Sequence, residues 1–236
     1  MPEALNADTI GEIAKRLNEP GWLTELRRKA WAAHTGLPWP HASDDIWRRT
    51  DASLLDPLRG FSLAQPALLQ SIRLTETQLA GLTRPLGQEQ LVVRVDGVWL
   101  TEAPSRGIVI QELPAAAQSH PDPIRQAIEA DGLTEAEQKL ASLNLAFHHD
   151  DLFVQVPANF SGEQPLRLVR LLTASARRAA FPMTIIAVGA GSSVTLIDEY
   201  VSVTDPSAAP APHLVNSPIE LVLEPDASVH YVRLQR

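Results

Sequence analysis

Two stretches of the chain repeat one pattern and decide the fold: AVGAGSSVTLI (Ala187–Ile197) and VLEPDASVHYV (Val222–Val232). In each, an apolar run leads into a turn of small residues and then into a Ser-Val pair that opens a second apolar run. A constant offset of 35 residues relates the two copies. Strand–turn–strand units at a fixed spacing are typical of a β-solenoid, in which each coil buries its inward face against its neighbours. Because two copies are a short repeat, a β-sandwich remains the alternative.

The rest of the chain divides by hydrophobic period. Helical spacing of apolar residues predicts helices over 9–18, 22–34, 121–130 and 134–147, and alternation predicts a strand over 107–113. The spacing of Thr134 and Glu137 predicts a capping box at the start of the last helix. Alternating residues on both sides of Asp96–Gly97 predict a β-hairpin. After Pro157 the sequence consists of short β-branched runs cut by turns. We therefore expect an α+β protein, with an N-terminal α/β domain over residues 1–150 and a solenoid over residues 151–236.

Two details of this pattern are specific expectations. In the helix over 22–34, Arg27 is expected on the outer face together with Arg28 and Lys29. The final run, Ser228–Gln235, reads as a strand with no polar cap behind it. An uncapped strand edge invites pairing. We expect either that the sequence is a fragment of a longer protein or that a partner covers this end.

Composition excludes several classes of function. The net charge of −8 and the absence of a Lys/Arg block argue against a general nucleic-acid-binding protein. No run approaches the roughly 20 apolar residues of a membrane span, and no leader pattern is present, so we expect a cytoplasmic protein. Because the chain has no cysteine, a metal would be held by His, carboxylate or backbone oxygen.

The most suggestive ligand-type residues are His148, His149, Asp150 and Asp151, which stand in a row. Adjacent histidines on a strand point to opposite faces, and this spacing opposes a shared metal ion. The phrase FHH-DD-LFV also matches VRV-DG-VWL, in which Asp96–Gly97 forms the predicted turn. We therefore favour a turn between the last helix and the β-rich half, with Phe147 packed and both aspartates in water. The alternative is a His/carboxylate metalloenzyme.

Two further motifs receive structural interpretations. The glycine-rich GAGSS (Gly189–Ser193) is followed by a strand, whereas a phosphate-binding loop leads into a helix, so we expect a tight corner. The adjacent carboxylates Asp198 and Glu199 face opposite sides of a strand, and we expect a solvated strand end.

A family resemblance rests on five motifs in order. These are WRRTD (Trp47–Asp51), the Asp96–Gly97 hairpin, LNLAF followed by DLFVQVP (Leu143–Pro157), VTLIDEY (Val194–Tyr200) and a β-rich run ending in LQ. Together they resemble the SufD family of the SUF iron–sulfur cluster assembly system, over its N-terminal portion. The related SufB proteins share the motifs of the β-rich half but are less similar in WRRTD and the helical N-terminal part, which favours SufD.

The resemblance implies a right-handed parallel β-helix after residue 150. It also implies a SufB-like partner bound through the β-helix and a SufC-like ATPase bound through a C-terminal helical domain that this sequence lacks. The family's complex handles iron–sulfur clusters and uses ATP through the SufC-like partner. From this we expect a scaffold component, not an enzyme, with no catalytic, cofactor or metal residue in this chain. A homodimer through the open β-helix end is a further expectation.

Overall fold

The computed structural model describes residues 5–41, 43, 47–49, 60–64, 75–101, 107–129, 133–174, 177–204 and 213–236. Of the WRRTD motif, Thr50 and Asp51 lie outside the described residues. The fold is mixed α/β, with parallel and mixed sheets, as expected in outline.

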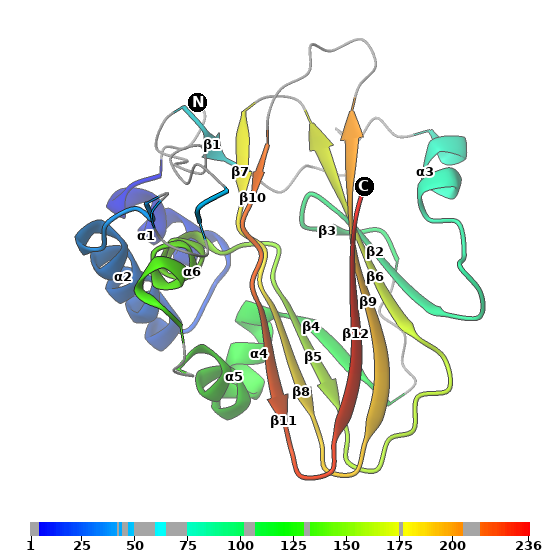
Figure 1. The fold of residues 1–236 in the computed structure, drawn as a ribbon. Helices are drawn as coiled ribbons and strands as arrows, with labels where there is room; N and C mark the ends of the chain where they lie inside the picture. Colours follow the sequence, from blue (N-terminus) through cyan, green and yellow to red (C-terminus); the bar gives the residue numbers. More distant parts are fainter. Residues whose placement is uncertain are drawn as a thin grey trace.

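The helices gather on the two sides of the strands (Figure 1). They are α1 (Ala7–Arg16), α2 (Gly21–Gly36), α3 (Glu76–Leu82), α4 (Leu113–Ser119), α5 (Pro121–Ile128) and α6 (Glu135–Phe147). Helices α1, α2 and α6 cluster on one side, and α3 lies on the other (Figure 1). Thr134 and Glu137 form the reciprocal capping box that the sequence predicted at the start of α6.

The strands form three sheets, each named here by its central strand. The strands are β1 (Ser62–Leu63), β2 (Gln90–Val95), β3 (Val98–Trp99), β4 (Val109–Glu112), β5 (Leu152–Val156), β6 (Leu166–Ala174), β7 (Arg178–Ala180), β8 (Thr184–Val188), β9 (Ser193–Thr204), β10 (Leu214–Val215), β11 (Ile219–Leu223) and β12 (Ser228–Gln235). The β7 sheet has the order β1-β7-β10, the β8 sheet β11-β8-β5-β4, and the β9 sheet β12-β9-β6-β2-β3.

From β5 onward the chain visits the sheets in a constant order: β8 sheet, β9 sheet, β7 sheet, and again. Strands of successive circuits pair in parallel. Val188 pairs with Leu223, and Val194 pairs with Val229. The 35-residue repeat predicted from the sequence is therefore confirmed as a structural register.

The GAGSS stretch forms the predicted tight corner. Gly191 and its repeat equivalent Asp226 both have left-handed backbone, with φ of +65° and +59°. A Cβ added to Gly189 would lie 2.5 Å from the backbone nitrogen of Ala158, so only glycine fits at this corner. Backbone hydrogen bonds run between circuits here, from Asn159 N to Ala190 O.

Strands from before residue 150 join the later sheets. The predicted hairpin at Asp96–Gly97 is confirmed, and its strand β2 pairs in parallel with β6. Strand β4, which corresponds to the strand predicted over 107–113, pairs with β5. It ends at Glu112 because helix α4 starts at Leu113. The sequence did not predict α4. The domain boundary at residue 150 stays a prediction.

Apolar side chains fill the space between the sheets and between sheet and helices. Between the β8 sheet and the β9 sheet, Leu168 and Ile186 belong to one cluster of buried apolar residues. On the outer face of the β8 sheet, Phe153 and Ile185 pack under α4 and α5 and against Leu23 of α2. In the described part of the chain, no helix is both long and apolar enough to cross a membrane.

Gly189→Ala tests the tight corner. The added methyl would overlap the backbone at Ala158, and overpacking against backbone costs about 1–3 kcal/mol or more. We expect the denaturant midpoint to fall. Gly11→Ala is the matched control, because an added Cβ there meets nothing within 4 Å in helix α1 and alanine favours helix. Equal denaturant midpoints for Gly189→Ala and Gly11→Ala would contradict the claim that only glycine fits at this corner.

Candidate functional site

The HHDD stretch, His148–Asp151, lies between the end of α6 and the start of β5, as predicted. Helix α6 ends at Phe147, whose side chain is fully buried, and β5 starts four residues after His148. Asp150 has the left-handed backbone of a turn residue, with φ of +60°. The hairpin template fails in one respect, because the residues before this turn are helical and not a strand.

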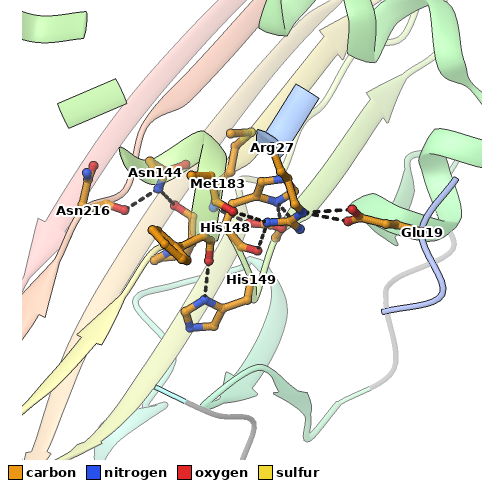
Figure 2. Close-up of polar contacts among 11 residues, drawn as sticks. Glu19, Arg27, Asn144, His148, His149, Met183 and Asn216 are labelled. Carbon is orange, nitrogen blue, oxygen red and sulfur yellow. Dashed lines mark hydrogen bonds and ion pairs between the residues drawn. The ribbon is translucent and has the colours of Figure 1, made fainter. Parts of the chain in front are cut away.

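The two histidine side chains turn to different partners (Figure 2). Nδ1 of His148 hydrogen-bonds Oδ2 of Asp151, whereas Nδ1 of His149 donates to the Phe147 carbonyl at 3.0 Å. Asp150 accepts from Nε of Arg94 at 2.6 Å. Nε2 of His148 is buried without a hydrogen-bond partner, but one nitrogen is short of the three or four ligands of a zinc site. Across the described residues no group of three or more His, Cys, Asp or Glu side chains could hold a metal.

The expectation that both aspartates lie in water is wrong. Asp151 is 3% exposed, and its Oδ1 accepts from the backbone nitrogen of Met183 at 2.8 Å. The Asp150 side chain is 7% exposed beside Arg94. Each carboxylate finds a buried donor, Asp150 in Arg94 of β2 and Asp151 in the backbone just before β8.

Arg27 lies at the centre of a buried cluster with Glu19, His148 and Asp151, which we call the joint. The expectation that Arg27 lies on the outer face of α2 is wrong. Its side chain is fully buried. Nε contacts both carboxylate oxygens of Glu19 at 3.0 and 2.9 Å, and Nη1 donates to the carbonyls of Ala146 (3.3 Å) and His148 (2.9 Å). Nη2 lies 3.2 Å from Nδ1 of His148. The guanidinium thereby ties α2 to the end of α6.

The position of Arg27 has an electrostatic reason. The last carbonyls of a helix lack intrahelical donors and carry partial negative charge. A guanidinium offers five donors in a plane, so Arg27 satisfies carbonyls at the end of α6 while keeping a carboxylate partner. Glu19 has a fully buried side chain and supplies the compensating charge.

Burial and charge move the pKa values of three groups in the joint. Burial lowers the pKa of Arg27, although Glu19 and Asp151 oppose the shift. Burial by itself would raise the pKa of Asp151, but His148 and Arg27 beside it outweigh this and lower the pKa below its ordinary value. Burial lowers the pKa of His149, against the hydrogen bond to Phe147.

Two asparagines extend the joint toward the sheets (Figure 2). Nδ2 of Asn144 donates to the carbonyls of Asn216 (2.6 Å) and Pro182 (3.4 Å). Nδ2 of Asn216 in turn donates to the Leu140 carbonyl at 2.7 Å. Helix α6 is therefore bound through side chains to the segments that enter β8 and β11.

Buried Lys139 joins α6 to the far end of α2. Its Nζ donates to the carbonyls of His34 (2.6 Å) and Leu37 (2.7 Å). A cation at a helix C-terminus is stabilised by the helix dipole. The ammonium also lies 5.1 Å from the centre of the Trp39 ring.

The expectation that Asp198 and Glu199 form a solvated strand end is also wrong. Both are 1% exposed. Asp198 pairs with Arg170, and Glu199 pairs with Arg167 at 2.6 Å. The partners lie on the neighbouring strand β6: Arg170 precedes Asp198 by 28 residues, and Arg167 precedes Glu199 by 32 residues.

The joint is buried, and most of its polar atoms bond to other groups of the protein; Nε2 of His148 and Oδ1 of Asn144 are the exceptions. Such an arrangement suits the positioning of helices against strands. A surface groove of about 490 Å³ lies elsewhere, and none of the four HHDD residues lines it. Its lining residues are Trp99, Leu100, Thr101, Ile110, Gln111, Glu112 and Ala115.

Comparison with known proteins adds an independent observation. No family model matches the chain. The iron–sulfur cluster assembly protein SufD of Bacillus subtilis is 25% identical over 234 residues, or 97% of this chain. Iron–sulfur cluster assembly SufBD family proteins of Staphylococcus epidermidis and Staphylococcus aureus are 22% identical over 98% of it. These matches support the SUF family. The chain spans about half the length of these relatives, 52% of the first and 50% of the other two.

Arg27→Met tests the buried joint. Removing the guanidinium leaves Glu19 buried without its partner, and breaking a buried pair in this way costs about 3–5 kcal/mol. We expect a matching loss of unfolding free energy in urea. Arg28→Met is the control, since Arg28 is next in sequence but its side chain is 62% exposed. If Arg27→Met were as stable as Arg28→Met, the claim that the buried Arg27–Glu19 pair stabilises the protein would be wrong.

His149→Gln tests the pH dependence of the joint. The pKa of His149 is lower in the folded protein than its ordinary value of 6.5, so the unfolded chain binds this proton first as the pH falls. Wild-type stability should therefore be full above about pH 6.5 and fall below it, and the variant should show a flatter profile between pH 7 and 5. Asp151 acts in a lower window, because its lowered pKa contributes stability that is lost below about pH 3.9. His230→Gln, at an exposed position on β12, should keep the wild-type slope. An unchanged slope in His149→Gln would contradict the assignment.

Proposed function

We propose that this chain is a SufD-like, non-enzymatic scaffold component of a SUF iron–sulfur cluster assembly complex of the SufBCD type. The observation that carries the proposal is the alignment of nearly the whole chain with relatives named for this assembly. The preference for SufD over SufB rests on the WRRTD motif and the helical N-terminal part. The buried HHDD residues support a structural role, because their polar atoms bind Arg94, the backbone at Met183 and one another.

We propose further that residues 151–236 are the first coils of a right-handed parallel β-helix and that residues 1–150 are the N-terminal α/β domain. The constant order in which the chain visits the three sheets supports this, as does the 35-residue register between β8–β9 and β11–β12. Parallel pairing of successive circuits is the geometry in which stacked coils bury a shared interior.

The proposed partners follow from the proposed family. A SufB-like protein would bind through the β-helix, and a SufC-like ATPase through a C-terminal domain outside this sequence. Clusters and ATP would be handled by the complex, with no cofactor held by this chain itself, in the cytoplasm. A homodimer through the open β-helix end is the competing assembly.

A His/carboxylate metalloenzyme at HHDD remains a distinct hypothesis, which the geometry does not favour. Asp150 and His149 turn away from the His148–Asp151 pair. Metal analysis of purified protein separates the two ideas. Stoichiometric zinc, iron or manganese that is lost in His149→Gln would support the enzyme and count against the scaffold.

Co-expression tests the scaffold role directly. A tagged copy of this chain, produced with SufB-like and SufC-like proteins of the same genome, is expected to retain the SufB-like protein at a stoichiometric ratio. Arg28→Met, altered at an exposed site, serves as the matched control and should retain it equally. Recovery of neither partner by a chain with native circular dichroism would contradict the proposal.

A further inference from the structure

The surface groove lies at the end of the sheets that is opposite to β11 and β12. Strand β3 is the last strand of the β9 sheet, and β4 is the last strand of the β8 sheet. Residues of these two strands, the two residues after β3 and one residue of α4 line the groove, which has a volume of about 490 Å³. This volume falls within the range of roughly 300–1,000 Å³ that is usual for sites of small organic ligands.

Apolar side chains form much of the wall of the groove. Trp99 and Leu100 come from the β3 side, whereas Ile110 belongs to β4 and Ala115 to α4. Ligand sites typically combine such a wall with a few fixed polar groups that orient the ligand. The polar side chains in this lining are Thr101, Gln111 and Glu112.

The carboxylate of Glu112 is oriented by three donors on one of its oxygens. Oε1 accepts from Nε1 of Trp99 at 3.0 Å, and both Nη1 and Nη2 of Arg94 lie 3.4 Å from it. In the part of the chain that the structure describes, no donor contacts Oε2. The Glu112 side chain is 45% exposed. The groove therefore presents an oriented carboxylate oxygen that is free to accept a hydrogen bond.

The charges around the groove favour a cation over an anion. Arg94 is shared by two carboxylates, because its Nε donates to Asp150 at 2.6 Å while its other nitrogens contact Glu112. The Arg94 side chain is only 3% exposed, so an anion in the groove would meet the Glu112 carboxylate before the guanidinium. None of the described lining residues is Lys, Arg or His. The accessible charge in the groove is therefore negative.

We propose that the groove between β3, β4 and α4 binds an alkylammonium group, with the ammonium on Oε2 of Glu112 and the alkyl chain against Trp99 and Leu100. An ammonium carries three donors, and the side-chain oxygens of Gln111 and Thr101 are the further acceptors in the lining. A free amine and a lysine side chain of another protein both carry this group. The inference goes beyond the proposed scaffold role and does not rest on it.

An NMR titration of the isotope-labelled full chain tests the inference. The indole N–H of Trp99 reports on the groove, because it donates to Glu112, and its signal is assigned with Trp99→Phe. We expect pentylamine to shift this signal saturably. Pentanol, which has the same chain without the charge, should bind at least roughly fivefold more weakly, as expected for loss of a partly exposed ion pair. N-acetyl-lysine methylamide distinguishes the sources: tighter binding than that of pentylamine assigns the groove to a lysine side chain, and weaker binding assigns it to a free amine.

Two variants locate the binding. Glu112→Gln removes the charge but keeps an oxygen for the indole N–H, and it should weaken pentylamine binding roughly fivefold. Ala115→Leu, at an exposed position of α4, narrows the groove without changing a charge or a buried residue, and it should weaken binding as well. Glu25→Gln is the matched control, because Glu25 is also an exposed carboxylate beside an arginine, Arg28, and lies outside the groove. It should bind pentylamine like the wild type.

Three results would overturn the inference. They are the absence of a saturable shift, equal affinities for pentylamine and pentanol, and wild-type affinity for pentylamine in Glu112→Gln or Ala115→Leu. The titration and the co-expression with a SufB-like protein can fail separately, because the groove and the proposed scaffold role are tested on different ligands.

Discussion

The buried guanidinium of Arg27 is the interaction on which the arrangement of helices and sheets depends. A charge in the interior is tolerated only with full compensation, and Arg27 obtains it from Glu19 and from carbonyls at the end of α6. This requirement fixes α2 against α6. The His148–Asp151 pair then carries the constraint into the sheets, because Asp151 also holds the backbone at Met183.

A second constraint governs the sheets themselves. Each circuit must match its neighbour residue for residue, because a slip by one position would turn the core face outward. The glycine corner at Gly189 and the left-handed residues Gly191 and Asp226 hold this register at the turns. The interior charges impose the same register, since Asp198 faces Arg233 only when β9 and β12 are aligned by 35 residues.

Sequence reasoning predicted the features that are local or periodic. The α6 capping box, the Asp96–Gly97 hairpin and the repeat register depend on neighbours in the chain, and all three are confirmed. The buried charges were missed because their partners are distant in sequence. Arg27 lies 121 residues from His148. A signal was nevertheless present, since Leu23, Arg27 and Ala30 follow the helical spacing of four and three residues. This spacing by itself assigns Arg27 to the buried face, whereas its charge led to the opposite expectation.

The HHDD stretch is therefore best understood as a joint between layers, in which ligand-type side chains serve as internal hydrogen-bonding groups. A double-mutant cycle on Arg27→Met and Asp151→Asn tests this account most directly, because both side chains contact Nδ1 of His148 and their charges act on each other. We predict a coupling free energy of unfolding between about 0.5 and 3 kcal/mol, as found for residues within one buried network. Additive effects, with a coupling energy of zero, would contradict the account and show that the helical layer and the sheets are held together independently of this joint.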